Sequence, residues 1–267
     1  RPPGGAVVRL RPPVPRPGQV FGIGLNYRDH AGESGMDLPS VPMVFTKFPS
    51  CIAGPTAEVP LSGTLVDWEV EIVAVIGREA RRVPTEDAWD VVAGLTLGQD
   101  VSDRAVQLAD QPPQFSMGKS FPAFGPIGPA IVPTDAFADR DDIGLWCDLD
   151  GARMQDGRTS DLIFSIPVLI AYLSSICTLQ PGDLVFTGTP SGVGMARGRF
   201  LAPGELLTSG AIAQAEYERL ESGLTASQAQ RRALTAGQGQ LAATASDGTI
   251  VAPISGIIAD KMLQVGD

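Results

Sequence analysis

Apolar positions in the first 205 residues predict strands separated by turns, with few helices. Residues 20–25 form an apolar run that ends in a glycine-rich bend, as expected of a buried strand. Residues 68–76 predict a longer strand, and because its second half is apolar at every position, both of its faces should be covered. We therefore expect this strand at the centre of a sheet, with a further short buried strand at 184–187.

Two segments of this part predict helices. Residues 85–92 predict a short helix with Thr85 as its N-cap and acidic residues in its first turn. Residues 165–176 predict a longer helix, in which Pro167 lies in the first turn, where a missing N–H is tolerated. The chain also has 31 glycines and 23 prolines in 267 residues. This composition favours a mixed α/β, β-rich fold with many turns over a helix bundle.

The chain changes character near residue 205, which predicts a domain boundary. All ten phenylalanines, three tryptophans and three cysteines precede residue 206, whereas residues 206–267 are rich in Ala, Gln, Ser and Thr. In this tail, three-four spacing of apolar residues from Tyr217 predicts an amphipathic helix, and residues 249–259 predict short strands. We interpret residues 1–17 as a Pro-rich leader left from a longer N-terminal segment, and 18–205 as the main domain.

Charge and cysteine content exclude some classes of protein. Twenty Lys and Arg against thirty Asp and Glu give a net charge of −10, which disfavours nucleic acid as a partner. The longest apolar stretch, 162–177, is interrupted by Pro and Ser, so no membrane span is expected within residues 1–205. Three widely spaced cysteines without a Cys-x-x-Cys pair indicate reduced thiols, and therefore a cytoplasmic location.

Two glutamates in the long central strand could form a metal site. Glu69 and Glu71 are two residues apart, so their carboxylates project from the same face. Two such charges in an apolar strand cost several kcal/mol each unless a cation compensates them. Asp100, which follows another apolar segment, could complete an all-oxygen site for Mg²⁺ or Mn²⁺, or for Ca²⁺. Alternatively, both glutamates lie on a solvated strand face and Asp100 is an ordinary turn residue.

Three further positions could have chemical roles. His30 is the only histidine, and Glu33 would contact it if this segment turns helically, giving a general base for water. Lys119 stands between Gly118 and Ser120, which could present its ammonium to an anion. The glycine- and hydroxyl-rich loop at 187–192 could offer backbone amides to a carboxylate. The alternatives are a histidine and a lysine on ordinary surface loops.

Six ordered motifs resemble the fumarylacetoacetate hydrolase family. They are Gly-Leu-Asn-Tyr-Arg-Asp-His (24–30), Asp-Trp-Glu-Val-Glu (67–71), Gln-Asp-Val-Ser-Asp-Arg (99–104), Gly-Lys-Ser-Phe (118–121), Gln-Asp-Gly-x-Thr (155–159) and Thr-Gly-Thr-Pro-Ser-Gly-Val-Gly (187–194). The resemblance implies a β-rich roll that forms a homodimer. It implies metal ligands Glu69, Glu71 and Asp100, catalytic residues His30, Glu33 and Lys119, and substrate-binding residues Tyr27, Arg104 and Thr189. Asp103 replaces a small residue of many relatives and could tune its neighbour Arg104.

The same resemblance implies an enzyme that acts on a small 2-oxo acid. The first expectation is a metal-dependent hydrolase that cleaves a C–C bond of a 2,4-dioxo acid of the acylpyruvate type. In it, a metal-chelated enolate would form while His30 and Glu33 activate water. The alternative reactions are isomerisation, hydration or decarboxylation of 2-oxo or 2-hydroxy-diene dioates, as in aromatic catabolism.

A second resemblance begins where the first ends. Residues 209–217 are similar to the start of the returning hairpin helix in the periplasmic adaptor proteins of efflux pumps. Residues 250–256 and 265–267 are similar to half of their lipoyl-type barrel. This resemblance implies a chimera in which the hydrolase sheet lacks its closing strands. It also gives a hypothesis of another class, a non-enzymatic efflux adaptor fragment.

Overall fold

The computed structural model describes residues 10–213, and the chain divides into two compact units, 1–217 and 218–267. The strands are β1 (Val20–Gly24), β2 (Met43–Thr46), β3 (Ile52–Ala53), β4 (Val66–Asp67), β5 (Val70–Ile76), β6 (Val92–Gln99), β7 (Ser102–Asp103), β8 (Gly125–Val132), β9 (Ile143–Leu149), β10 (Ala152–Arg158), β11 (Leu184–Phe186) and β12 (Leu207–Ala213). The α-helices are α1 (Arg28–Ser34), α2 (Arg104–Gln107), α3 (Phe115–Gly118), α4 (Ile166–Ile176) and α5 (Gly194–Arg197). The 3₁₀ turns are η1 (Pro49–Cys51), η2 (Thr85–Val91), η3 (Thr134–Ala136) and η4 (Thr159–Asp161).

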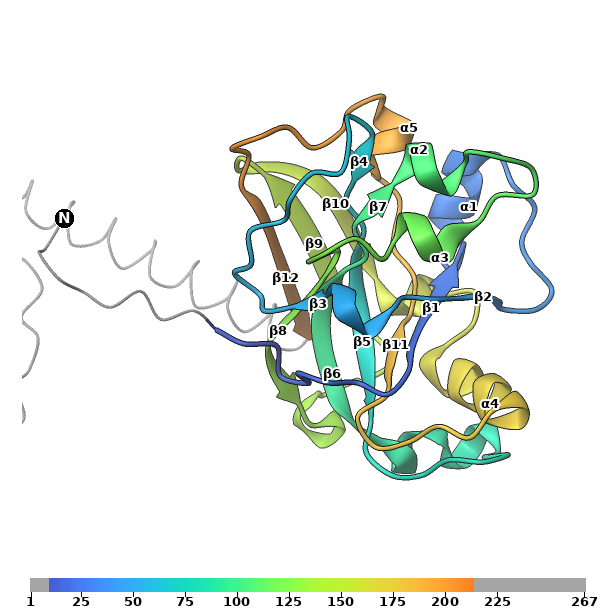
Figure 1. The fold of residues 1–267 in the computed structure, drawn as a ribbon. Helices are drawn as coiled ribbons and strands as arrows, with labels where there is room; N and C mark the ends of the chain where they lie inside the picture. The colour runs from blue at the N-terminus through green and yellow to red at the C-terminus, as the bar shows by residue number, and fades with distance from the viewer. Residues whose placement is uncertain (1–9, 214–267) are drawn as a thin grey trace, which may run out of the picture. The chain divides into compact units, whose positions relative to one another are not determined.

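The strands form a seven-stranded sheet and a smaller three-stranded sheet. The large sheet has the order β2-β1-β11-β5-β6-β8-β3, and the small one has the order β10-β9-β12. Strand β9 contacts β5, and β12 contacts β6, so the small sheet covers part of one face of the large one (Figure 1). The mixed, β-rich fold with few helices is thereby confirmed for the described part of the chain.

Strand β5 lies at the centre of the large sheet, as predicted, between β11 and β6. All seven of its residues are buried. Ile72 and Ala74 pack into the main core together with residues of β9 and α4, whereas Val73 and Val75 pack on the opposite face with Val20. A strand that is covered on both faces holds its ends rigidly, and the acidic residues lie at one of these ends.

The other elements predicted in this part are confirmed, with one correction. Strands β1 and β11 and helix α4 lie where the apolar pattern placed them, and Pro167 lies in the first turn of α4. The segment after Pro84 is a 3₁₀ helix, η2, whose N-cap is Pro84. The predicted cap at Thr85 is therefore wrong: Thr85 already lies inside the helix.

Strand β12 corrects the expectation of a helix that begins at residue 209. Its residues pair antiparallel with β9 over the full length of both strands, from Leu207 opposite Leu149 to Ala213 opposite Ile143. The main domain therefore has a strand beyond residue 205, and this strand forms one edge of the small sheet. The helix and the short strands predicted for the remainder of the tail lie outside the described residues.

The expectations for the cysteines and for a membrane span can be compared with the structure of residues 10–213. The three cysteines are unpaired; Cys51 and Cys147 are buried and Cys177 is partly buried. None of the helices in this range is long and apolar enough to cross a membrane.

Candidate active site

The three predicted carboxylates meet at one end of strands β5 and β6. Glu69 immediately precedes β5, Glu71 is its second residue, and Asp100 follows β6. The two strands are antiparallel with Val70 opposite Gln99, and the Asp100 N–H donates to the Glu69 carbonyl at 2.8 Å. One oxygen from each carboxylate lies within 4.8 Å of the others. All three residues are buried, so the alternative of a solvated strand face is wrong.

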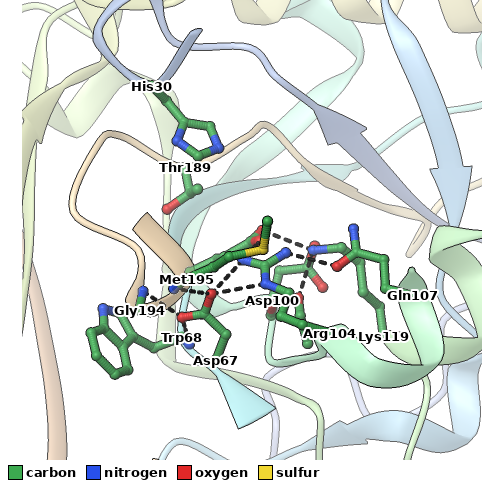
Figure 2. Close-up of polar contacts among 12 residues, drawn as sticks. His30, Asp67, Trp68, Asp100, Arg104, Gln107, Lys119, Thr189, Gly194 and Met195 are labelled. Carbon is green, nitrogen blue, oxygen red and sulfur yellow. Dashed lines mark hydrogen bonds and ion pairs between the residues drawn. The ribbon is translucent and has the colours of Figure 1, made fainter. Parts of the chain in front are cut away.

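Two buried cations compensate Glu69. The Lys119 ammonium lies 2.8 Å from Glu69 Oε2 and 2.7 Å from Asp100 Oδ2, and Arg104 Nη2 lies 2.6 Å from Glu69 Oε1 (Figure 2). Burial alone would raise the pKa of Glu69, but Lys119 and Arg104 outweigh it and lower the pKa to about 2. Lys119 is buried, so the alternative of an exposed loop lysine is wrong.

Glu71 has no such compensation. Its Oε2 accepts the Gly188 N–H at 2.7 Å, and within residues 10–213 it forms no ion pair with a basic side chain. Burial, followed by the charges of Asp100 and Glu69, raises its pKa well above the ordinary value. A carboxylate held beside two others at this depth needs a cation to ionise, and an oxygen-only site suits Mg²⁺, Mn²⁺ or Ca²⁺. The residues present therefore fit a divalent ion held by Glu69, Glu71 and Asp100.

Three buried residues that sequence reasoning missed complete the network. Lys47 pairs with Asp100, Gln107 accepts a hydrogen bond from Arg104 Nη1 at 2.8 Å, and Asp67 accepts one from Arg104 Nε at 2.8 Å. Asp67 also accepts the N–H groups of Gly194 and Met195, at 2.6 and 3.0 Å, and so links Arg104 to the first turn of α5 (Figure 2). The sequence holds one indication of Lys47, the rarity of lysine: there are only three in 267 residues.

Helix α1 presents the predicted histidine–glutamate pair. His30 Nδ1 lies 3.3 Å from Glu33 Oε2, which confirms the helical spacing. Glu33 also accepts the Gly192 N–H at 3.1 Å, and Asp29 accepts the Ser191 hydroxyl at 2.7 Å. These bonds tie α1 to the glycine-rich loop. Figure 2 shows His30 and Thr189 together, above the network that contains Asp100, Arg104 and Lys119.

The three residues expected to bind substrate lie around this cluster and differ in how far their polar groups are already hydrogen-bonded. Arg104 already uses its guanidinium on Asp67 and Glu69. The Thr189 hydroxyl donates to the Val70 carbonyl at 2.8 Å and accepts from Gln155 at 2.7 Å. Tyr27 is fully buried, and its hydroxyl has no hydrogen-bond partner within residues 10–213. Burial, and then the charge of Glu71, raises its pKa, so the phenol stays protonated and is available as a donor.

Asp103 has a different role from the one expected. Its carboxylate accepts the N–H groups of Ala105 and Val106 at 2.9 and 3.2 Å, which makes it the N-cap of α2. It also accepts the Ser62 hydroxyl at 2.5 Å. It therefore fixes the helix that begins with Arg104 and forms no hydrogen bond with the guanidinium, whose partners are Asp67, Glu69 and Gln107.

Comparisons with known proteins show which family this chain resembles. The fumarylacetoacetate (FAA) hydrolase C-terminal family model matches residues 19–230. The fumarylacetoacetate hydrolase domain-containing protein 2 homolog of Dictyostelium discoideum is 41% identical over 225 residues, which are 80% of this chain and 72% of that protein. The chain spans 65% of the next curated relative, a Burkholderia multivorans protein named as a hydrolase candidate, which is 47% identical over 184 residues.

Two solved structures share the fold. The HpcE candidate from Mycobacterium smegmatis is 51% identical, with a TM-score of 0.75 over 79% of this chain and 76% of that one. The 5-carboxymethyl-2-hydroxymuconate delta-isomerase from the same organism is 34% identical, with a TM-score of 0.67 over 77% of this chain and 79% of that one. The family match runs past residue 205 and includes β12, and nothing in these comparisons shows an efflux adaptor. The chain belongs to the fumarylacetoacetate hydrolase family, and it is an enzyme of that family.

Proposed function

We propose that this enzyme is a divalent-metal-dependent hydrolase that cleaves a C–C bond of a 2,4-dioxo acid of the acylpyruvate type. The observation that carries the proposal is the buried triad of Glu69, Glu71 and Asp100 with the His30–Glu33 pair on a neighbouring helix. A divalent ion bound there would supply a Lewis acid that polarises the 2-oxo acid and stabilises an enolate.

The charges of the buried network favour an anionic substrate once the ion is bound. Four carboxylates, those of Asp67, Glu69, Glu71 and Asp100, face the three cations Lys47, Arg104 and Lys119. If all are ionised, the cluster has one net negative charge, and a divalent ion makes it net positive by one. The sign of this net charge matters in a buried site, because a substrate carboxylate that leaves water needs a compensating positive charge.

His30 is the candidate base for water. Glu33 accepts from Nδ1 when this nitrogen carries the proton, so Nε2 is left as the acceptor for a proton from water. The carboxylate also stabilises the imidazolium that results. Glu33 is itself fixed by the Gly192 N–H, so the pair keeps its orientation relative to the glycine-rich loop.

Lys119 is the candidate group for the charge that develops on the substrate. Its buried ammonium donates to Glu69, Asp100 and the Ser102 hydroxyl at 2.7–2.8 Å. Burial would lower its pKa, but the charges of Asp100 and Glu69 raise it above the ordinary value, so it stays protonated. A cation held this firmly can stabilise an enolate oxygen without reorganising. Tyr27, with its unpartnered hydroxyl, is the candidate donor to a substrate oxygen.

The second candidate function is isomerisation of a 2-hydroxy-diene dioate. One solved relative is named a 5-carboxymethyl-2-hydroxymuconate delta-isomerase. The same triad and lysine would stabilise a dienolate, and His30 would move a proton between carbons in place of activating water. We also propose a cytoplasmic homodimer, which sedimentation equilibrium and fractionation of the native host would test.

The test is Mn²⁺- or Mg²⁺-dependent loss of the enol absorbance of acetylpyruvate by the full chain. Turnover that needs the metal and is lost in both Glu69→Ala and His30→Ala would support the hydrolase. Glu79→Ala, an exposed glutamate, is the control and should keep its activity. No turnover of acetylpyruvate, with metal-dependent isomerisation of a 2-hydroxy-diene dioate, would overturn hydrolysis in favour of the second candidate.

A further inference from the structure

We propose that Lys47 is a positioning residue that fixes the Asp100 carboxylate and so determines how tightly the triad holds a divalent ion. The inference rests on the proposed metal site and concerns a residue that lies beyond the triad. Lys47 follows β2, and its N–H donates to the Val20 carbonyl at 3.0 Å. Its side chain is fully buried, which is rare for lysine unless the ammonium is paired.

The contacts of Lys47 divide the two oxygens of Asp100. The Lys47 ammonium lies 2.6 Å from Asp100 Oδ1, and the Lys119 ammonium lies 2.7 Å from Oδ2. Lys119 also bonds Glu69 Oε2, so Oδ2 is the oxygen turned toward the other acids. Lys47 holds the opposite oxygen and thereby sets the rotation of the carboxylate.

Lys47 also fixes the backbone that presents Lys119. Its ammonium donates to the carbonyl of Lys119 in addition to Asp100. Lys47, Asp100 and Lys119 therefore form a closed ring, in which the two lysines bond opposite oxygens of one carboxylate and the first lysine bonds the main chain of the second. Two groups of the proposed site, one ligand and one substrate-stabilising cation, are positioned by this single ammonium.

Stability alone does not account for this arrangement. Taking an ammonium and a carboxylate out of water costs several kcal/mol per ion, and well-packed apolar residues of similar volume often serve the fold as well. The surroundings of Lys47 are apolar enough for such a replacement: the Phe186 ring centroid is 5.8 Å from the ammonium, and Cys51 and Gly125 lie beside its stem. What an apolar pair in place of Lys47 and Asp100 would lose is an oriented carboxylate for the ion.

Three explanations of the role of Lys47 predict different changes in the affinity for Mn²⁺ when this lysine is removed. In Lys47→Met, a nearby positive charge disappears, so electrostatics alone would make Mn²⁺ bind more tightly. A purely structural role would lower the melting temperature and leave the affinity unchanged. Positioning predicts weaker binding, because Asp100 is free to rotate onto Lys119. Lys47→Arg keeps the charge but moves the donor, and it too should weaken binding, by a smaller factor.

The experiment measures the Mn²⁺ dissociation constant by calorimetry for the full chain and both variants, with melting temperatures recorded without metal. Val75→Ala, a core truncation near the opposite end of β5 from Glu71, is the control for lost stability and should keep the wild-type constant. A rise of about tenfold or more in Lys47→Met, with a smaller rise in Lys47→Arg, supports the proposal. An unchanged or lower constant overturns it.

Other outcomes are equally decisive. If Lys47→Met does not fold, Lys47→Arg decides the question, because both competing explanations predict an unchanged constant for it. If wild type binds Mn²⁺ and the variants bind equally well, the positioning role fails and the proposed metal site stands. If wild type binds no divalent ion, both fail.

Discussion

At the scale of single residues, Glu71 shows most directly how the site departs from what folding alone would select. It is buried beside two other carboxylates, and it accepts a hydrogen bond from the backbone amide of Gly188. We expect Glu71→Gln to raise the unfolding free energy of the metal-free protein by about 1 kcal/mol, because the buried Glu71 carboxyl must either take up a proton or carry an uncompensated charge, and glutamine does neither. The same change should abolish the stabilisation by Mn²⁺, since bound ligand raises the melting temperature only while it binds the native state.

Thermal unfolding with and without Mn²⁺ measures both parts of this prediction. Glu79→Gln removes an exposed carboxylate and should leave the metal-free temperature and the metal shift at their wild-type values. A Glu71→Gln protein that is less stable without metal, or that keeps the full shift with Mn²⁺, would contradict the account of the site.

Cys147 gives a prediction about pH. Burial raises the pKa of its thiol to about 12, whereas a cysteine in an unfolded chain has a pKa of about 8.5. Because the folded pKa is the higher one, the stabilisation is complete below about pH 8.5 and is lost as the pH rises toward 12. Between about pH 8.5 and 10 the unfolding free energy should fall by up to about 2 kcal/mol through this residue.

The contribution of Cys147 to the unfolding free energy is measured as the difference between the pH profiles of wild type and Cys147→Ala. Urea unfolding of wild type and Cys147→Ala between pH 7 and 10 removes the effect of tyrosines and lysines, which both proteins share. The variant should be less stable near neutral pH, and its profile should be the flatter one. Two parallel profiles would show that the thiol does not stay neutral in the native state.

Sequence reasoning found the residues that have a local pattern and missed those defined by distant pairing. Glu69 and Glu71 were found because strand periodicity places them on one face, and His30 and Glu33 because a helical turn brings them together. Lys47 was missed because its partner is 53 positions away, and only the arrangement of β2 beside β1 brings it behind Asp100. Local spacing contains no information about such a contact.

At the scale of elements, α1 and the glycine-rich loop form one unit. Asp29 accepts both the N–H and the hydroxyl of Ser191, at 3.2 and 2.7 Å, and Glu33 accepts the Gly192 N–H. Asp29→Ala should therefore release α1 and lower kcat about tenfold, the equivalent of about 1.4 kcal/mol in the orientation of His30. Because these bonds are at the surface, the melting temperature should change little.

Steady-state kinetics of Asp29→Ala with the substrate that wild type accepts measures this effect. Asp135→Ala, which removes an exposed acid from the first turn of η3, is the matched control and should keep its kcat. An unchanged kcat in Asp29→Ala would show that α1 keeps its position without the loop.

The residues of β12 do not by themselves predict a strand, which is why this segment resembles the start of a helix. Its small residues, such as Gly210 and Ala211, have little strand propensity of their own. Gly210 lies opposite Trp146 of β9, where the indole ring occupies the place that a side chain would need. The strand is thus specified by its neighbour, a tertiary effect that overrides local propensity. Strand β11 and residues 72–76 of β5, by contrast, are apolar at every position and could be predicted without knowing what they pair with.

At the scale of the whole molecule, β12 decides where the catalytic unit can end. It pairs with β9 along seven residues, and its Ser209 hydroxyl accepts a hydrogen bond from Gln99 of β6 at 2.7 Å. Leu207 packs against the main core. A chain that ends at residue 205 loses all of these contacts and leaves β9 with an unpaired edge, which invites association with other chains.

We therefore expect two truncations to behave differently. The chain 1–217 contains the whole first compact unit, and it should keep the melting temperature of the catalytic unit and its response to Mn²⁺. The chain 1–205 should lose several kcal/mol of stability and aggregate, because burial of Leu207 and the β9 pairing are both removed. Light scattering and thermal unfolding of the two truncated chains test this prediction, since the chains differ by only 12 residues. If the shorter chain were monomeric and as stable as the longer one, β12 would be dispensable to the fold. The boundary inferred from composition at residue 205 would then be the physical end of the catalytic unit.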